Sequence, residues 1–157
     1  MSEQREIPEY AKPALYVGSL ILAMVAAIIT FTSDFGWWYN GSSYPDFALY
    51  GVYVDWYGKL VLVLLGLGFL YLAFISLQQI YPVLKVSDET KKKLEKSGFF
   101  MALSLIILTL IVMGIFIASV SDAWDWDLGT SFYADLFGGI LIAVFFWLAR
   151  RIQTPTK

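Results

Sequence analysis

The sequence predicts an all-α membrane protein that folds as a bundle of four transmembrane helices. Of its 157 residues, 59% are hydrophobic and only 15% are charged, whereas about a quarter of the residues in an average soluble domain are charged. The mean hydropathy is +0.66. Four runs with little or no charge approach the roughly 20 residues that a helix needs to cross a bilayer. We therefore expect one integral membrane domain over residues 1–157.

The four runs place the expected spans at residues 13–32, 60–81, 99–120 and 132–149. Proline is tolerated in the first turn of a helix, so Pro13 is compatible with the start of the first span. The glutamates before this span are atypical of a signal peptide, and we expect it to be retained. The fourth uncharged run reaches spanning length only if it includes Asp135. Ser87 precedes good helix formers and is expected to cap a cytoplasmic extension of the third span.

The distribution of lysine and arginine predicts the orientation. All but one of the 11 basic residues lie in the two tails and the middle loop, and the exception is Lys59. Loops 33–59 and 121–135 instead carry Asp34, Asp46, Asp55, Asp122, Asp125, Asp127 and Asp135. Cytoplasmic segments of membrane proteins carry the excess of basic residues. We therefore expect a multi-pass protein of the cell membrane with both termini in the cytoplasm.

Composition also limits the classes of function. The chain has no histidine and no cysteine, so it lacks the usual protein ligands for haem, iron–sulfur clusters, copper and catalytic zinc, and the nucleophile–base pairs that use these residues. We expect no enzyme activity, no catalytic residue and no cofactor. The spans lack the charged residues that mark ion pathways. No strongly basic patch indicates a nucleic-acid partner.

The two outer loops resemble each other at an offset of 88 residues. Segment 33–44 aligns with segment 121–132, and the identical residues of the first copy are Ser33, Asp34, Trp38, Gly41 and Ser43. This pattern indicates a tandem duplication of a helical hairpin, with halves at 13–84 and 97–151. Both halves would start inside, as parallel repeats related by an axis along the membrane normal. Chance similarity between aromatic, glycine-rich loops remains the alternative.

Aromatic residues are concentrated on the outer side. Tryptophan and tyrosine favour the headgroup region of a bilayer, and large exposed aromatic surfaces often mark interfaces. The residues expected to form a partner or lipid surface are Trp37, Trp38, Tyr44, Trp56, Trp124, Trp126 and Phe132. Segment 47–57 is rich in β-branched and aromatic residues, so we expect a short strand or β-hairpin there, within the first outer loop.

Three further features are possible sites. Asp122, Asp125 and Asp127 could meet around a hard cation such as calcium, although a solvated acidic turn is the favoured interpretation and no metal is expected. Lys59 could form a structural ion pair with Asp135, or one with Asp55. Asn40 begins a glycosylation sequon on the outer side.

Small residues recur at the spacing that lets transmembrane helices approach closely. They are Ser19, Ala23 and Ala27 in the first span, Gly114 and Ala118 in the third, and Ala134, Gly138, Gly139 and Ala143 in the fourth. Packing inside the bundle is the favoured interpretation, and contact with another protein is the alternative.

The arrangement of four spans, cytoplasmic termini and a longer first outer loop with tryptophans resembles the claudin and related tetraspan families in architecture. The sequence departs from their motifs, because Gly36-Trp37-Trp38 lacks the leucine of a Gly-Leu-Trp motif and the chain has no cysteine. Tetraspanins resemble it less, since their cysteine motifs and large second loop are missing. No residue role is transferred from these families.

We expect a non-catalytic subunit or scaffold of a larger membrane assembly, with membrane lipids and other membrane subunits, or copies of itself, as partners. Two alternatives remain open. One is an accessory subunit that shapes a quinone or lipid pocket of a respiratory or transport complex, with walls formed by Trp38, Tyr44, Trp126 and Phe132. The other is a claudin-like adhesion or self-assembly protein.

Overall fold

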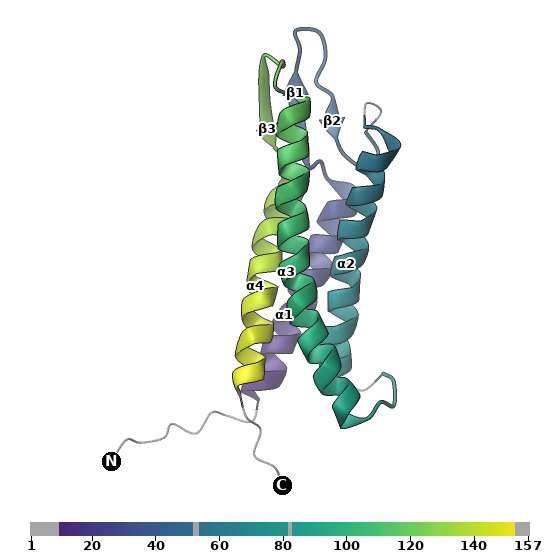
Figure 1. Ribbon diagram of the computed structural model, residues 1–157, viewed down its shortest axis with the longest axis vertical. Coiled ribbons are helices and arrows are strands. Elements are labelled where there is room, and N and C mark those ends of the chain that lie inside the picture. The colour runs from purple at the N-terminus through teal and green to yellow at the C-terminus, as the bar shows by residue number, and fades with distance from the viewer. Residues whose placement is uncertain (1–9, 52–53, 82, 153–157) are drawn as a thin grey trace, which may run out of the picture.

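Four long helices lie side by side along the longest axis of the molecule (Figure 1). The computed structural model describes residues 10–51, 54–81 and 83–152. Each helix is long and apolar enough to cross a membrane, so the expected bundle of four apolar helices is confirmed. The helices are α1 (Ala11–Thr32), α2 (Trp56–Ile80), α3 (Asp88–Ser119) and α4 (Thr130–Arg151).

Helices α3 and α4 are longer than the expected spans, and local sequence signals stabilise the added turns. The hydroxyl of Ser87 accepts a hydrogen bond from the backbone N–H of Thr90 at 3.3 Å, which satisfies one unpaired donor of the first turn of α3. The expected extension of the third span is therefore confirmed, and Asp88 and Glu89 lie at the positive end of the helix dipole. At the other end of the chain, Arg150 and Arg151 form the last turn of α4, where their charge is favourable for the same reason.

Each helix packs against two neighbours, since α1 and α3 both contact α2 and α4. The buried core between them is apolar and includes Leu62, Phe69, Leu72, Leu105 and Phe146. The chain enters α1 and leaves α4 at the same end of the bundle, where the α2–α3 connection also lies (Figure 1). We call this the termini end, and the opposite end the sheet end.

The small residues fall into two groups. Ser19, Ala23 and Ala27 of α1 are buried, as expected for close packing inside the bundle. By contrast, Gly114 and Ala118 of α3 face outwards, and no neighbouring atom lies within 4 Å of the place where a Cβ of Gly114 would stand. The prediction that Gly114 and Ala118 pack inside the bundle is therefore wrong.

Three short strands cover the sheet end (Figure 1). They are β1 (Gly36–Tyr39), β2 (Asp46–Phe47) and β3 (Asp125–Leu128), in the order β2-β1-β3 with both pairings antiparallel. The expected hairpin over 47–57 is displaced, since only Phe47 of that segment is in a strand, Trp56 and Tyr57 begin α2, and residues 52–53 lie outside the described residues. Strand propensity identified the first loop but not its partner in the second, because such pairing is set by tertiary contacts.

Candidate functional site

The sheet joins the two outer loops into one structure, which we call the cap (residues 36–47 and 124–129). Central strand β1 pairs with β2 from its own loop and with β3 from the other. In the second pairing Trp38 lies opposite Trp126, and Trp37 lies opposite Asp127. Two further backbone hydrogen bonds extend this contact. The N–H of Gly129 donates to the carbonyl of Phe35 at 2.8 Å, and the N–H of Trp124 donates to the carbonyl of Tyr39 at 2.9 Å. The cap therefore ties the α1–α2 half to the α3–α4 half.

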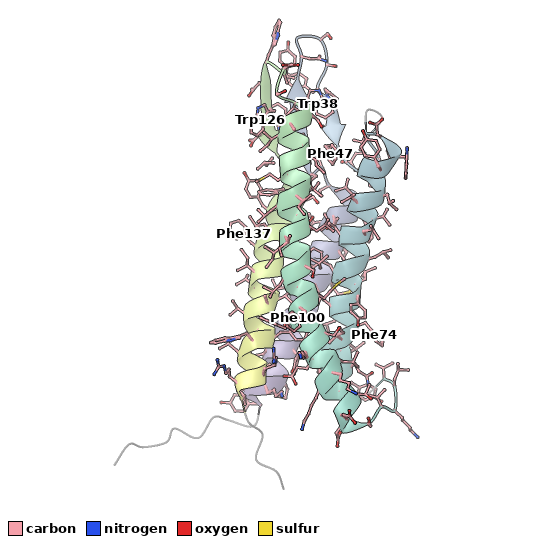
Figure 2. The ribbon with its side chains drawn as sticks, in the orientation of Figure 1. Trp38, Phe47, Phe74, Phe100, Trp126 and Phe137 are labelled. Carbon is pink, nitrogen blue, oxygen red and sulfur yellow. The ribbon has the colours of Figure 1, made fainter. Side chains whose placement is uncertain are left out.

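The side chain of Phe116 anchors the cap to the bundle. It is fully buried in the last turns of α3, and its ring is in edge contact with Trp38 at 6.3 Å, Phe47 at 5.7 Å and Trp126 at 6.2 Å between ring centres. Figure 2 shows Trp38 and Trp126 beside this end of α3. A Cβ at Gly36 would lie 2.6 Å from the Phe116 ring, so a glycine there lets β1 approach it. Sequence reasoning missed Phe116 because it reads as one more apolar residue of a span.

The residues expected to form a partner or lipid surface separate in the structure. Tyr44, Trp124 and Trp126 are exposed on the cap, whereas Trp37 and Trp38 are half-buried. Trp56 is exposed but belongs to the first turn of α2.

The prediction that Phe132 belongs to this surface is wrong, because only 5% of its area is exposed. The start of α4 at Thr130 turns its ring into the bundle, where it packs edge-on against Phe35 at 5.6 Å.

The structure does not bring the three aspartates of the second outer loop together into one cluster. Asp122, Asp125 and Asp127 are exposed, and no group of three potential ligating side chains is present among residues 10–51, 54–81 and 83–152. Asp127 instead accepts a hydrogen bond from the backbone N–H of Leu128 at 2.7 Å. Carboxylates along an edge strand discourage pairing with further strands.

The expected ion pair between Lys59 and Asp135 is wrong. No ion pair within the described part of the chain contains Lys59, and the carboxylate of Asp55 accepts a hydrogen bond from Tyr57 instead. Asp135 is fully buried one and a half turns into α4, so the long side chain of a residue at the surface of α2 does not meet it.

Asp135 forms a polar contact between α1 and α4 instead. Its Oδ1 lies 2.6 Å from the hydroxyl of Thr30, which also contacts the carbonyl of Ala26 at 2.7 Å. The hydroxyl of Ser131 donates to Oδ2 at 3.4 Å. Thr30 and Ser131 are buried as well, and buried polar groups need such partners.

Asn40 is exposed next to the turn that follows β1. Its side-chain oxygen accepts a hydrogen bond from Ser43 at 3.1 Å, and Gly41 has a positive φ of 85°. The amide of the sequon is therefore accessible on the cap, but its glycosylation stays a prediction.

A cavity of about 210 Å³ lies between the sheet-end turns of α2 and α3, beneath β1 and β2. Its apolar wall includes Trp38 and Phe47, which Figure 2 places at this end, and also Val61 and Phe116. Polar groups line it too, from Asp55, Tyr57 and Ser119. Of the residues expected to wall a quinone or lipid pocket, only Trp38 lines this cavity.

The cap and this cavity suit contact and binding. Exposed rings beside carboxylates can contact another protein or lipid headgroups, and an apolar cavity with a polar part can hold an amphiphile. No family model, no curated protein and no solved structure matches the chain.

Proposed function

We propose that the protein is a non-catalytic subunit or scaffold of a larger membrane assembly. The observation that carries this proposal is the outward-facing pair of small residues on α3. Large exposed side chains, including Ile111 and Ile115, lie beside the pair, so α3 is narrower at Gly114 and Ala118 than at these neighbours. Small residues four apart on a lipid-facing surface allow a second helix to approach closely. A helix of another subunit is therefore the expected contact.

The cap supplies a second surface for the same role. Trp124 and Tyr44 are 79% and 69% exposed, and both contact Tyr39 of the central strand, Tyr44 by stacking at 4.5 Å and Trp124 edge-on at 6.1 Å. Large aromatic side chains with little freedom to lose are favoured at protein interfaces. The neighbouring aspartates favour a partner with basic residues.

Purification from native membranes tests this proposal. We expect larger membrane subunits to co-purify in fixed stoichiometry when the protein is extracted at native abundance in mild detergent and identified by mass spectrometry. Replacing Gly114 with isoleucine should strongly reduce this recovery, because a Cβ at this position meets open space outside the bundle and the larger side chain would keep a second helix away.

The matched control is Ala14→Ile, which enlarges an exposed small residue on α1 and should leave recovery unchanged. A chain that purifies alone or only with copies of itself would contradict the proposal. Equal losses in the two variants would exclude the α3 surface as the contact.

The cavity between α2 and α3 favours a second candidate function, an accessory subunit that shapes a quinone or lipid pocket. Its aromatic and aliphatic wall suits an apolar ring or chain. The hydroxyls of Tyr57 and Ser119 donate their hydrogens to Asp55 and Ile115, and their oxygens could accept a hydrogen bond from a lipid headgroup or a quinol. This candidate predicts that solvent extracts of the same purified assembly contain a stoichiometric quinone or lipid, and an extract without one would exclude it.

The proposed duplication into halves 13–84 and 97–151 rests on the resemblance between the two outer loops. Trp38 and Trp126 correspond at the offset of 88 residues, and they are also direct partners in the antiparallel pairing of β1 with β3. A two-fold axis between two antiparallel strands places equivalent residues opposite each other. That local axis is perpendicular to the strands, which run along the bundle (Figure 1). The axis that would relate α1 to α3 and α2 to α4 runs along the bundle instead, so the strand pairing is no argument for the duplication.

The proposed orientation in the cell membrane places the cap outside and the termini end in the cytoplasm. Because the chain has no cysteine, single cysteines can report the side of the membrane. We expect Ser42→Cys, on the cap, to react with an impermeant maleimide in intact cells. Glu89→Cys, at the start of α3, should react only after permeabilisation, and the reverse pattern would overturn the orientation. Both positions are exposed.

A further inference from the structure

An apolar groove runs between α3 and α4 in the half of the bundle near the termini end. Its volume is about 300 Å³, and all the side chains that line it are apolar. The main contributors are Phe99, Leu103 and Ile106 from α3, and Ile140, Val144 and Trp147 from α4. Val144 and Trp147 are almost half exposed, so the groove is open on the outside of the bundle, on the surface that faces lipid in a membrane.

Two arginines lie against the walls of this groove. The guanidinium of Arg150 is 5.6 Å from the centre of the Phe99 ring, and that of Arg151 is 5.2 Å from the Trp147 ring. Both rings line the groove. A guanidinium group stacked on an aromatic ring keeps the N–H donors around its edge free to bind an anion.

A third base lies on α3, one turn beyond the wall of the groove. Lys96 precedes Phe99 by one turn, and its ammonium lies 5.9 Å from the neighbouring Phe100 ring, which Figure 2 places towards the termini end. Towards the sheet end, the residues of α3 that follow Phe99 along the groove are Leu103 and Ile106. Along both helices the side chains thus change from basic near the termini end to apolar in the groove, as a lipid changes from headgroup to tail.

These three bases have no carboxylate partner within residues 10–51, 54–81 and 83–152. The ion pairs of this part of the chain join Lys12 to Glu95, Lys91 to Asp88, and Lys93 to Glu89. The positive charge at the mouth of the groove is therefore not neutralised by the described residues.

We propose that the groove binds one anionic phospholipid, with an acyl chain along its apolar walls and the phosphate against Arg150, Arg151 and Lys96. Arginine suits phosphate because its donors can bind two oxygens at once. Basic pockets between transmembrane helices beside the cytoplasmic surface are typical binding places for anionic headgroups. This site is separate from Gly114 and Ala118 on α3 and from the cap, so it does not depend on the function proposed above.

Lipid titration of the whole protein in non-ionic detergent, followed by native mass spectrometry, tests the site. Phosphatidylglycerol should bind as one tightly retained molecule and more tightly than phosphatidylcholine with the same chains. The Arg150→Gln/Arg151→Gln variant should bind phosphatidylglycerol about 30-fold more weakly, since each base near a headgroup contributes about 1 kcal/mol and 1.4 kcal/mol is tenfold. The matched control is Lys91→Gln/Lys93→Gln, which removes the same charge from bases that are already paired, and its affinity should be unchanged.

A second variant tests the groove without changing any charge. Val144→Trp should fill the groove and reduce binding of both lipids, whereas Val25→Trp, at a similarly exposed position on α1, should not. Glycerol 3-phosphate should not bind, because it has no acyl chain, and tight binding of it would instead indicate a site for a free phosphate. Equal affinity for the two lipids, or equal losses in the two charge variants, would overturn the proposal.

Discussion

Replacing Phe116 with alanine is expected to lower the free energy of unfolding by about 3 kcal/mol or more, the usual range for a buried phenylalanine. The ring is fully buried and in contact with Trp38, Phe47 and Trp126. Its loss would leave a cavity where the cap meets α3, as well as removing three aromatic contacts. Unfolding in mixed micelles with increasing sodium dodecyl sulfate measures the change.

The control for this variant is Phe100→Ala, on the same helix. Phe100 is 52% exposed on the outer surface of the bundle, so its removal should lower the free energy of unfolding much less. A Phe116→Ala protein as stable as the Phe100→Ala protein would show that the cap is not anchored through this ring. Tryptophan fluorescence should also change in the first variant, because Trp38 and Trp126 both contact Phe116.

Replacing Asp135 with alanine should lower the free energy of unfolding by about 1–2 kcal/mol. The change leaves the buried hydroxyl of Ser131 without the carboxyl group that it contacts, whereas the buried hydroxyl of Thr30 keeps the carbonyl of Ala26 as its acceptor. An unpaired buried polar group costs about 1–3 kcal/mol, although hydrogen bonds between transmembrane helices average about 0.6 kcal/mol. The same unfolding assay measures the effect, and Asp122→Ala, at an exposed position, is the control with no expected loss.

The Asp135→Asn variant separates hydrogen bonding from charge. The hydroxyl of Thr30 has one hydrogen but contacts two acceptors, the carbonyl of Ala26 and Asp135. An asparagine amide can donate to Thr30 and accept from Ser131, so this variant should keep most of the stability that alanine loses. A double-mutant cycle with Lys59→Gln should give no coupling. A coupling energy of about 1 kcal/mol or more would show that Lys59 and Asp135 do interact as an ion pair.

These variants also bear on the proposed role in an assembly. The cap can present Trp124 and Tyr44 to a partner only while β1 and β3 are held together, and Phe116 contacts a side chain of each strand. Loss of partners in the Phe116→Ala protein together with retained folding would link the cap to assembly. The Gly114→Ile variant tests the helix surface independently.

Much of the fold follows from local properties of the sequence. Length and hydropathy were enough to predict four apolar helices, because a segment that spans a membrane must satisfy its own backbone hydrogen bonds. The cap of Ser87 and the extension of α3 were also predictable, since a capping residue acts on its own first turn. The aromatic and acidic character of the loops was visible for the same reason, and Tyr44 and Trp124 are exposed as expected.

The sequence by itself thus determined which segments are helical and where charge and aromatic residues lie along the chain. Only the tertiary structure decided what each side chain meets. It paired β1 with β3, turned Phe132 inwards, gave Asp135 a partner in Thr30, and left Gly114 facing outwards. These contacts join residues far apart in the chain, so they depend on the relative position and rotation of helices. Nearly uniform apolar spans do not encode that rotation in a hydrophobic period, because lipid and core accept the same side chains.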